Sequence, residues 1–105
     1  IDVRSLLPFD KNKKIVNSIK KTNRVVFADE DVSGGASAFM MQKVIEEQDG
    51  YFHLDSKPIT IHSKDHRPAY SSDGDYFSKP NCEMIFEKIY SLFNEMNPNA
   101  FPKLN

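Results

Sequence analysis

The most constraining feature of this sequence is an almost unbroken apolar run from Arg24 to Ala28, enclosed by two stretches with helical periodicity. β-Branched and aromatic residues in such a short run are typical of a strand that is buried on both faces of a parallel sheet. We therefore expect a central strand here. A helix from about Asp10, which we expect to be its N-cap, to Thr22 precedes it and places Ile15, Val16 and Ile19 on one face.

The same alternation of strand and helix patterns extends over most of the chain. The expected elements are a strand at Ile1 to Arg4, a helix opened by Ser33 to Ala36 and ended by Gly50, a short turn at Tyr51 to Leu54, a strand at Pro58 to His62, and a helix at Asn81 to Met96 capped by Asn81. This order predicts an α/β fold with three layers, α/β/α, and a mostly parallel sheet. Residues 1–97 would form the domain and residues 98–105 an irregular tail.

Charge and composition exclude several classes of function. Fourteen basic and fifteen acidic side chains leave a net charge of −1, so no overall field attracts the chain to nucleic acid or to anionic lipid. No apolar stretch is long enough to cross a bilayer, and no signal-peptide pattern is visible. Cys82 is the only cysteine and cannot form an internal disulfide. We expect a cytoplasmic protein that binds neither nucleic acid nor membrane.

Two loops resemble ligand-binding motifs but lack the required residues. The segment from Asp31 to Gly35 lies between a strand and a helix, where a phosphate could bind. It lacks the glycine spacing of nucleotide-binding loops, and the acidic residues from Asp29 to Asp31 would repel a phosphate. We interpret it as a turn whose small residues allow close approach of the backbone. Asp73 to Asp75 lacks the remaining ligands of a calcium loop.

Other reactive side chains are better explained as structural or surface residues. His62 and His66 have a spacing that aligns metal ligands only on a helix, whereas a strand end and a loop carry them here, and His53 lies elsewhere. Cys82 is expected to be a buried or half-buried packing residue. The lysines from Lys11 to Lys21 form a solvated helix face. The residues alone therefore predict no catalytic, cofactor-binding or metal-binding site.

Three segments, taken in order, carry a family resemblance. They are Ile1 to Asp10, with Arg-Ser-Leu-Leu-Pro-Phe-Asp at its end, then Lys20 to Glu30, with Lys-Thr before the apolar strand, then the pair Gly34-Gly35. Over residues 1–96 this order and spacing resembles the transketolase-type C-terminal domain. It is most similar to that domain in the β part of the decarboxylating component of thiamine-diphosphate-dependent 2-oxoacid dehydrogenases.

The resemblance implies a parent oxidoreductase within a multienzyme complex. Such an enzyme decarboxylates a 2-oxoacid, here of the branched-chain 2-oxoisovalerate or the pyruvate type, and transfers the acyl group to the lipoyl arm of an acyltransferase core. Thiamine diphosphate and magnesium would bind in other domains, so this chain alone would be inactive. The C-terminal domain would support contacts with other domains and subunits and dock the acyltransferase. The segment Leu54 to Ile59 resembles the family's stretch near that dock, which implies that Asp55 contacts a partner.

Departures from the family pattern leave alternatives open. The family's first strand and helix would precede Ile1, and without them an exposed sheet edge or apolar surface would favour self-association. The segment between His62 and Pro80 is longer and more charged than the family pattern. The chain could instead be the C-terminal domain of a transketolase or of a deoxyxylulose-phosphate synthase. A third alternative is an independent α/β module that binds a small ligand at the turn from Ser33 to Ala36.

Overall fold

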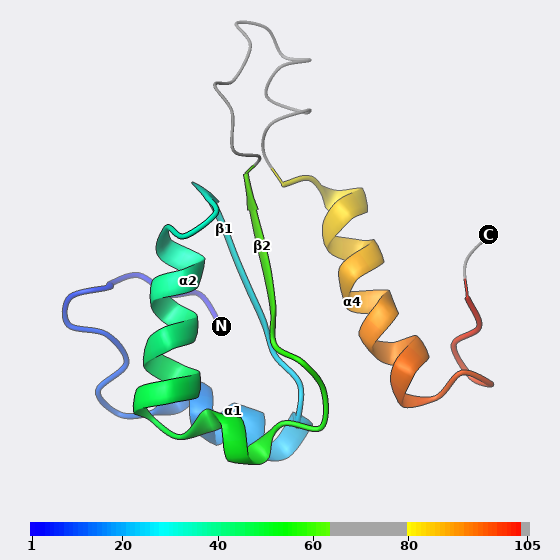
Figure 1. Ribbon diagram of the computed structural model, residues 1–105, viewed down its shortest axis with the longest axis horizontal. Helices are drawn as coiled ribbons and strands as arrows, with labels where there is room; N and C mark the ends of the chain where they lie inside the picture. Colours follow the sequence, from blue (N-terminus) through cyan, green and yellow to red (C-terminus); the bar gives the residue numbers. More distant parts are fainter. Residues whose placement is uncertain (64–79, 104–105) are drawn as a thin grey trace, which may run out of the picture.

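The computed structural model describes residues 1–63 and 80–103, and it contains both helices and parallel strands (Figure 1). In chain order the elements are α1 (Lys14–Thr22), β1 (Val26–Val32), α2 (Ala36–Met41), the π-helix η1 (Gln42–Glu47), the 3₁₀ helix η2 (Gly50–His53), β2 (Ile59–Ser63) and α4 (Cys82–Met96). The predicted α/β class is confirmed, and so is the alternation of helices and strands from α1 onward.

The sheet has two parallel strands in the described part of the chain. Val26 of β1 lies opposite Ile59 of β2, and the register becomes irregular beyond Ala28. The prediction of a strand at residues 1–4 is wrong, since these residues have no regular structure. A strand requires a hydrogen-bonded neighbour. Among the described residues, no backbone hydrogen bond joins residues 1–4 to β1.

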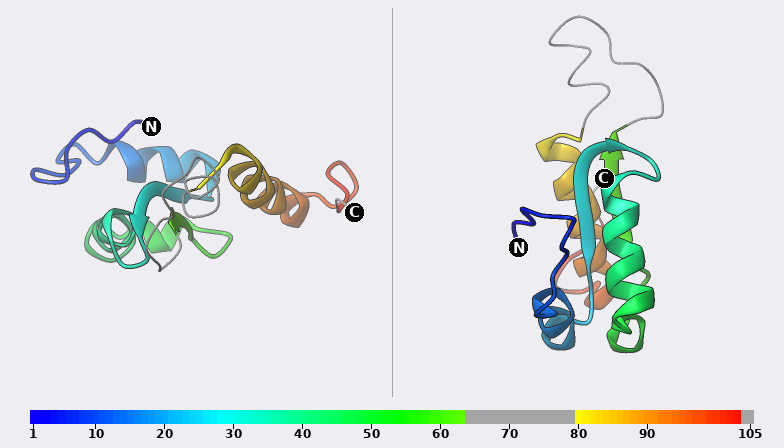
Figure 2. Two further views of the ribbon diagram at one scale, coloured as in Figure 1. Left: turned by 90° about the horizontal axis from the view of Figure 1, so that it is seen from above. Right: turned by 90° about the vertical axis from the view of Figure 1, so that its left-hand side faces the viewer.

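The two sides of the sheet are covered unequally. Figures 1 and 2 show α2 and η1 on one side of the strands and α4 on the other. Phe27 is buried, but the next residue, Ala28, is exposed, so the prediction that β1 is central and buried on both faces is wrong. The reason is that α4 is not packed closely against the strands, and Leu92 is its only buried residue. The described residues form a small α/β domain with a two-stranded parallel sheet and three α-helices.

The core lies between α1, β1 and the helix formed by α2 and η1. Its buried apolar members are Ile15, Val16, Ile19, Phe27, Met40 and Val44. The three residues from α1 recur at a spacing that places them on one helical face, whereas the lysines of α1 point to solvent. The apolar face predicted for this helix is therefore the face that it buries.

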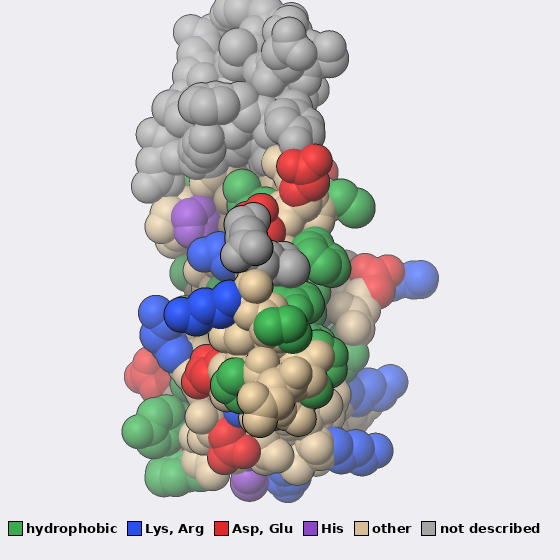
Figure 3. Space-filling view, turned by 90° about the vertical axis from the view of Figure 1, so that its right-hand side faces the viewer, with side chains coloured by type: hydrophobic (Ala, Val, Ile, Leu, Met, Phe, Trp, Pro, Cys, Tyr) green, Lys and Arg blue, Asp and Glu red, His purple; other side chains and the backbone are tan. Residues whose placement is uncertain are grey.

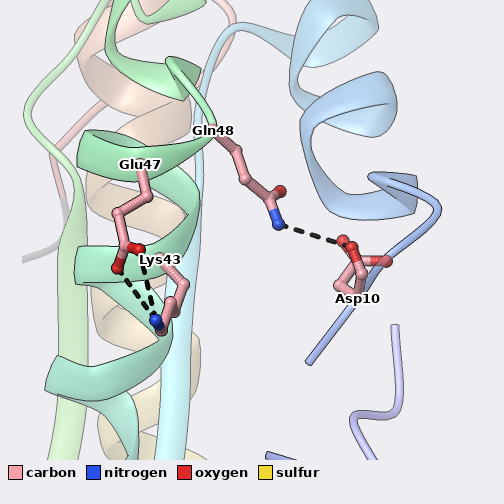
Figure 4. A network of polar contacts seen from close by, with 4 residues as sticks. All are labelled: Asp10, Lys43, Glu47 and Gln48. Carbon is pink, nitrogen blue, oxygen red and sulfur yellow. Dashed lines mark hydrogen bonds and ion pairs between the residues drawn. The ribbon is translucent and has the colours of Figure 1, made fainter. Parts of the chain in front are cut away.

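Helix α1 begins four residues later than the sequence suggests. Asp10 and Lys13 both have positive φ, so the chain turns there and cannot be helical. The Asp10 carboxylate nevertheless accepts hydrogen bonds of 3.0 Å from the backbone N–H groups of Lys14 and Ile15, which caps the helix as predicted. Gln48 donates to the Asp10 carbonyl oxygen at 3.4 Å and thereby ties the end of η1 to the start of α1 (Figure 4).

The second helix continues from α2 into a π turn and ends near the predicted position. A Cβ atom on Gly50 would lie 2.7 Å from the carbonyl oxygen of Val44, so only glycine fits where the chain turns back into η2. The short turn predicted after it is confirmed as η2. Helix α4 is capped as predicted, because the Asn81 side chain accepts a hydrogen bond of 3.0 Å from the N–H of Met84.

Candidate functional site

The only residue that the sequence assigns to a partner contact, Asp55, lies at a corner between η2 and β2. Asn23 holds this corner, which we define as residues 53–56, from both ends. Its side-chain amide donates to the carbonyl oxygen of His53 at 2.9 Å, and its own carbonyl oxygen accepts from the N–H of Asp55 at 2.9 Å. Asn23 adopts a left-handed conformation with φ 62°, and its N–H also caps α1 through the carbonyl of Ile19.

The backbone of the corner is fixed, but the Asp55 side chain is exposed. Leu54 packs against the core from the inside, and the hydroxyl of Ser56 donates to the carboxylate of Glu95 at 3.1 Å, which links the corner to α4. An anchored backbone with a solvent-facing carboxylate presents a negative charge at a defined position. Such a group favours a cationic partner and directs how it approaches.

Two aromatic residues stand beside the corner. Tyr51 and Phe52 are 66% and 78% exposed and contact each other edge to face, with ring centroids 5.7 Å apart. Large aromatic side chains dominate the binding energy of many protein interfaces. The pair and Asp55 together combine an apolar anchor with a charge.

An apolar groove of about 880 Å³ separates α4 from α1 and β1. Ile89, Phe93 and Met96 of α4 line one wall and remain 40%, 43% and 49% exposed. Figure 3 looks onto the outer side of the molecule, where α4 lies, and shows hydrophobic side chains among charged ones at that surface. Most of the lining is apolar, and charged residues such as Arg24 and Asp29 stand among the apolar ones, so the groove is suited to contact with protein surface.

The turn after β1 does not have the form of a phosphate site. Gly34 has a φ of 86°, which favours glycine, and Gly35 lies against the Asp31 side chain, which a Cβ atom at position 35 would displace. Asp29 and Asp31 accept hydrogen bonds from the backbone N–H groups of the turn, namely those of Asp31 and Val32. A phosphate would meet carboxylates where it requires donors.

The remaining side chains considered from the sequence are dispersed. His62 is half-buried on β2 with its Nδ1 atom 2.8 Å from the Ser63 carbonyl oxygen, and His53 is half-buried in η2. His66 and the Asp73 to Asp75 segment lie outside the described residues. Within residues 1–63 and 80–103, no group of three or more His, Cys, Asp or Glu residues is placed to hold a metal ion.

Two expectations about surface residues have different outcomes. Lys11, Lys13, Lys14, Lys20 and Lys21 are all exposed, as predicted for a solvated face. Cys82, expected to be buried or half-buried, is exposed instead. It lies in the first turn of α4, where the helix does not pack closely against the strands, so its position on the apolar face does not bury it.

Asn23 is the residue whose role the sequence analysis missed. A signal for it exists, because asparagine directly after a helix with lysines in its last turn is typical of a left-handed C-terminal cap. The bonds from Asn23 to residues 53 and 55 could not have been found in this way, since they span about thirty residues of chain.

Comparison with known proteins identifies no relative: no family model, no curated protein and no solved structure matches the chain. None of the described helices has the length and apolar character needed to cross a membrane. The class that the fold defines is thus a small parallel α/β domain with an exposed, anchored corner and an open apolar groove.

Proposed function

We propose that this chain is the C-terminal assembly and docking domain of the decarboxylating component of a thiamine-diphosphate-dependent 2-oxoacid dehydrogenase. Other parts of the parent enzyme would bind thiamine diphosphate and magnesium and decarboxylate a 2-oxoacid of the branched-chain or pyruvate type. This domain would contact those parts and dock the lipoyl acyltransferase core. The proposal starts from the ordered resemblance of residues 1–96 to that domain.

The observation that carries the proposal is the anchored corner at Asp55. Asn23 holds the backbone on both sides of Asp55, and the carboxylate faces solvent. This residue is the partner contact that the resemblance implies. The neighbouring Tyr51 and Phe52 supply exposed aromatic surface, which a docking site requires and a closed fold would bury.

The open groove supports an assembly role in the same way. A three-layer α/β/α arrangement would have α2 and η1 on one face of the sheet and α4 packed on the other. We propose that α4 completes this third layer when other parts of the parent enzyme fill the groove. Ile89, Phe93 and Met96 would then be buried, as apolar residues at helical spacing normally are.

Calorimetric titration of this chain tests the proposal. We expect no saturable heat with thiamine diphosphate and magnesium, and saturable binding of the subunit-binding domain of a lipoyl acyltransferase. Asp55→Asn removes the charge and keeps the shape, and it should weaken that binding about tenfold, as expected for one exposed charge pair at an interface.

Glu87→Gln is the matched control, because Glu87 is also exposed, and the substitution removes one negative charge from a residue that does not line the groove. It should leave the affinity unchanged. Equal effects of the two substitutions would show that net charge, and not Asp55, matters. Saturable binding of thiamine diphosphate would instead favour an independent ligand-binding module and contradict the proposal.

A further inference from the structure

The outer edge of β1 has no strand paired with it in the described part of the chain, and residues 1–3 line the groove beside it without pairing with it. The carbonyl oxygen of Val25 accepts from the N–H of Ile59 at 3.3 Å. In a parallel ladder, alternate residues direct their N–H and C=O groups to opposite neighbours, so those of Val26 and Ala28 point away from β2. No backbone hydrogen bond from another described segment reaches these two residues, and Ala28 is exposed. An unpaired edge of this kind is a template for strand addition.

The charges along this edge are polarised. Basic residues precede the strand, at Lys20, Lys21 and Arg24, and acidic residues occupy its end, at Asp29, Glu30 and Asp31. A second copy that adds in a parallel orientation would place like charges together. A copy that adds in the antiparallel orientation would place each basic end against an acidic end, which stabilises the pair.

Two charged atoms along this edge lack partners. Arg24 Nε and Asp29 Oδ2 are both inaccessible to solvent without a hydrogen bond, and both residues line the groove beside β1. Buried polar atoms without partners are costly. An antiparallel second copy would bring opposite charge to both ends of the edge.

We propose that two copies of this chain associate through the outer edges of β1, antiparallel and related by a twofold axis at Phe27. In this register Val26 of one copy pairs with Ala28 of the other, so the outward-facing backbone groups meet. We infer that the two ends of the edges then bring Arg24 of each copy toward Glu30 of the other, beyond the regular part of the ladder. The Glu30 side chain is exposed, and the Glu30 carbonyl oxygen accepts from the Ser63 hydroxyl of β2. The inference stands apart from the proposed function.

Sedimentation equilibrium of the chain, over about a hundredfold range of concentration, should show a monomer–dimer equilibrium. Arg24→Glu creates two Glu–Glu pairs in the dimer, and Glu30→Arg creates two Arg–Arg pairs. Each substitution should raise the dissociation constant about tenfold, because like charges brought together on neighbouring strands repel. The double variant should regain the affinity of the unmodified chain to within about threefold.

Mixing the two single variants gives the sharpest result. In the heterodimer the two introduced charges, a glutamate at position 24 of one copy and an arginine at position 30 of the other, lie near each other and attract. The unmodified Arg24 and Glu30 form the second pair, which is also attractive. The mixture should therefore dimerise about tenfold more tightly than either variant alone. Local damage to the fold in either variant cannot produce this gain. A mixture that associates no better than its components overturns the proposal.

A proline at the edge provides an independent test. Ala28→Pro removes an N–H group that points away from β2, so the ladder with β2 remains while the edge loses a donor. It should abolish the dimer, whereas Ala28→Val, which keeps the N–H, should not. An Ala28→Pro chain that dimerises as well as Ala28→Val contradicts the proposal. So does a strictly monomeric unmodified chain, the result expected if residues 1–4 of the same chain occupied the edge.

Discussion

The helix formed by α2 and η1 and the helix α4 are both amphipathic, yet they meet the sheet in opposite ways. On the closed side of the molecule, which comprises α1, α2 and η1, Met40 is 6% exposed and Val44 is fully buried. On the open side, formed by α4, Phe86 and Phe93 are 56% and 43% exposed. Apolar periodicity therefore shows that a helix has a face to bury, but not what buries it.

Chain connectivity accounts for the closed side. The helix formed by α2 and η1 joins two strands that are paired with each other, so the connection itself brings the helix against the sheet. Helix α4 follows β2 and does not return to another described strand. Its contact with the sheet depends on side chains alone, and those that line the groove beside β1 remain partly exposed. The open side is where we expect other protein surface to bind.

The largest difference in stability between the closed and the open side is expected for two isoleucines. Ile19 on the closed side is 2% exposed and Ile89 on the open side is 40% exposed. Ile19→Ala should lower the free energy of unfolding by about 2–5 kcal/mol, because it leaves a cavity in the core. Ile89→Ala should cost less than about 1 kcal/mol. Urea denaturation of both variants measures the difference, and equal losses would mean that the open side is part of the core.

Asn23 should be the most important polar residue of the closed side. Asn23→Ala removes the bond to the His53 carbonyl and places alanine at positive φ, and it should cost about 2 kcal/mol. Asn23→Gly removes the same bond but tolerates the backbone conformation, and it should cost about half as much. Thermal denaturation of the two variants separates the contributions, and the reverse order of stability would contradict this role.

Two helix caps offer a matched comparison. Asp10 caps α1 and Asn81 caps α4 through side-chain oxygens at 3.0 Å. Asp10→Ala should lower the free energy of global unfolding by about 1 kcal/mol, because α1 contributes to the core. Asn81→Ala should reduce the helicity of α4 by circular dichroism and change global stability by less than about 0.3 kcal/mol. Equal global effects would show that α4 unfolds with the core.

The smallest effect is expected for a surface ion pair. Lys43 and Glu47 lie one helical turn apart, 3.1 Å between Nζ and Oε2, and both side chains are partly exposed (Figure 4). Solvent screens such pairs, so Lys43→Met should change stability by no more than about 0.3 kcal/mol at physiological salt. The stabilities of the Lys43→Met variant and of the unmodified chain should differ less at high salt than at low salt. A larger loss that does not depend on salt would require another role for Lys43.

Much of the closed side could be predicted from the sequence. The apolar spacing in α1 and the Asp10 carboxylate at its start specify local structure, and the structure confirms both. A strand also forms at the apolar run, but β1 continues through three acidic residues to Val32 instead of ending at Ala28. The start of α1 was placed too early because the positive φ angles of Asp10 and Lys13 depend on tertiary contacts, among them the bond from Gln48. Local propensity does not contain that information.

The open side and the candidate site were harder to predict. Residues 1–4 have the alternation of a strand, but alternation without a hydrogen-bonded neighbour does not make one. Cys82 lies on an apolar helix face that nothing buries. Asp55 was selected by resemblance, whereas its anchorage by Asn23 depends on a contact between distant parts of the chain. In each case the missing information concerned what lies next to the segment in space.

Residue-specific amide hydrogen exchange of the chain tests most directly whether the domain is closed on one side and open on the other. The account predicts that amides of α2 and β2 exchange only through global unfolding, and that those of α4 exchange at least about tenfold faster through local opening. Equal protection of α4 and α2 would show that both helices belong to one cooperative core. The open docking side on which this account depends would then not exist.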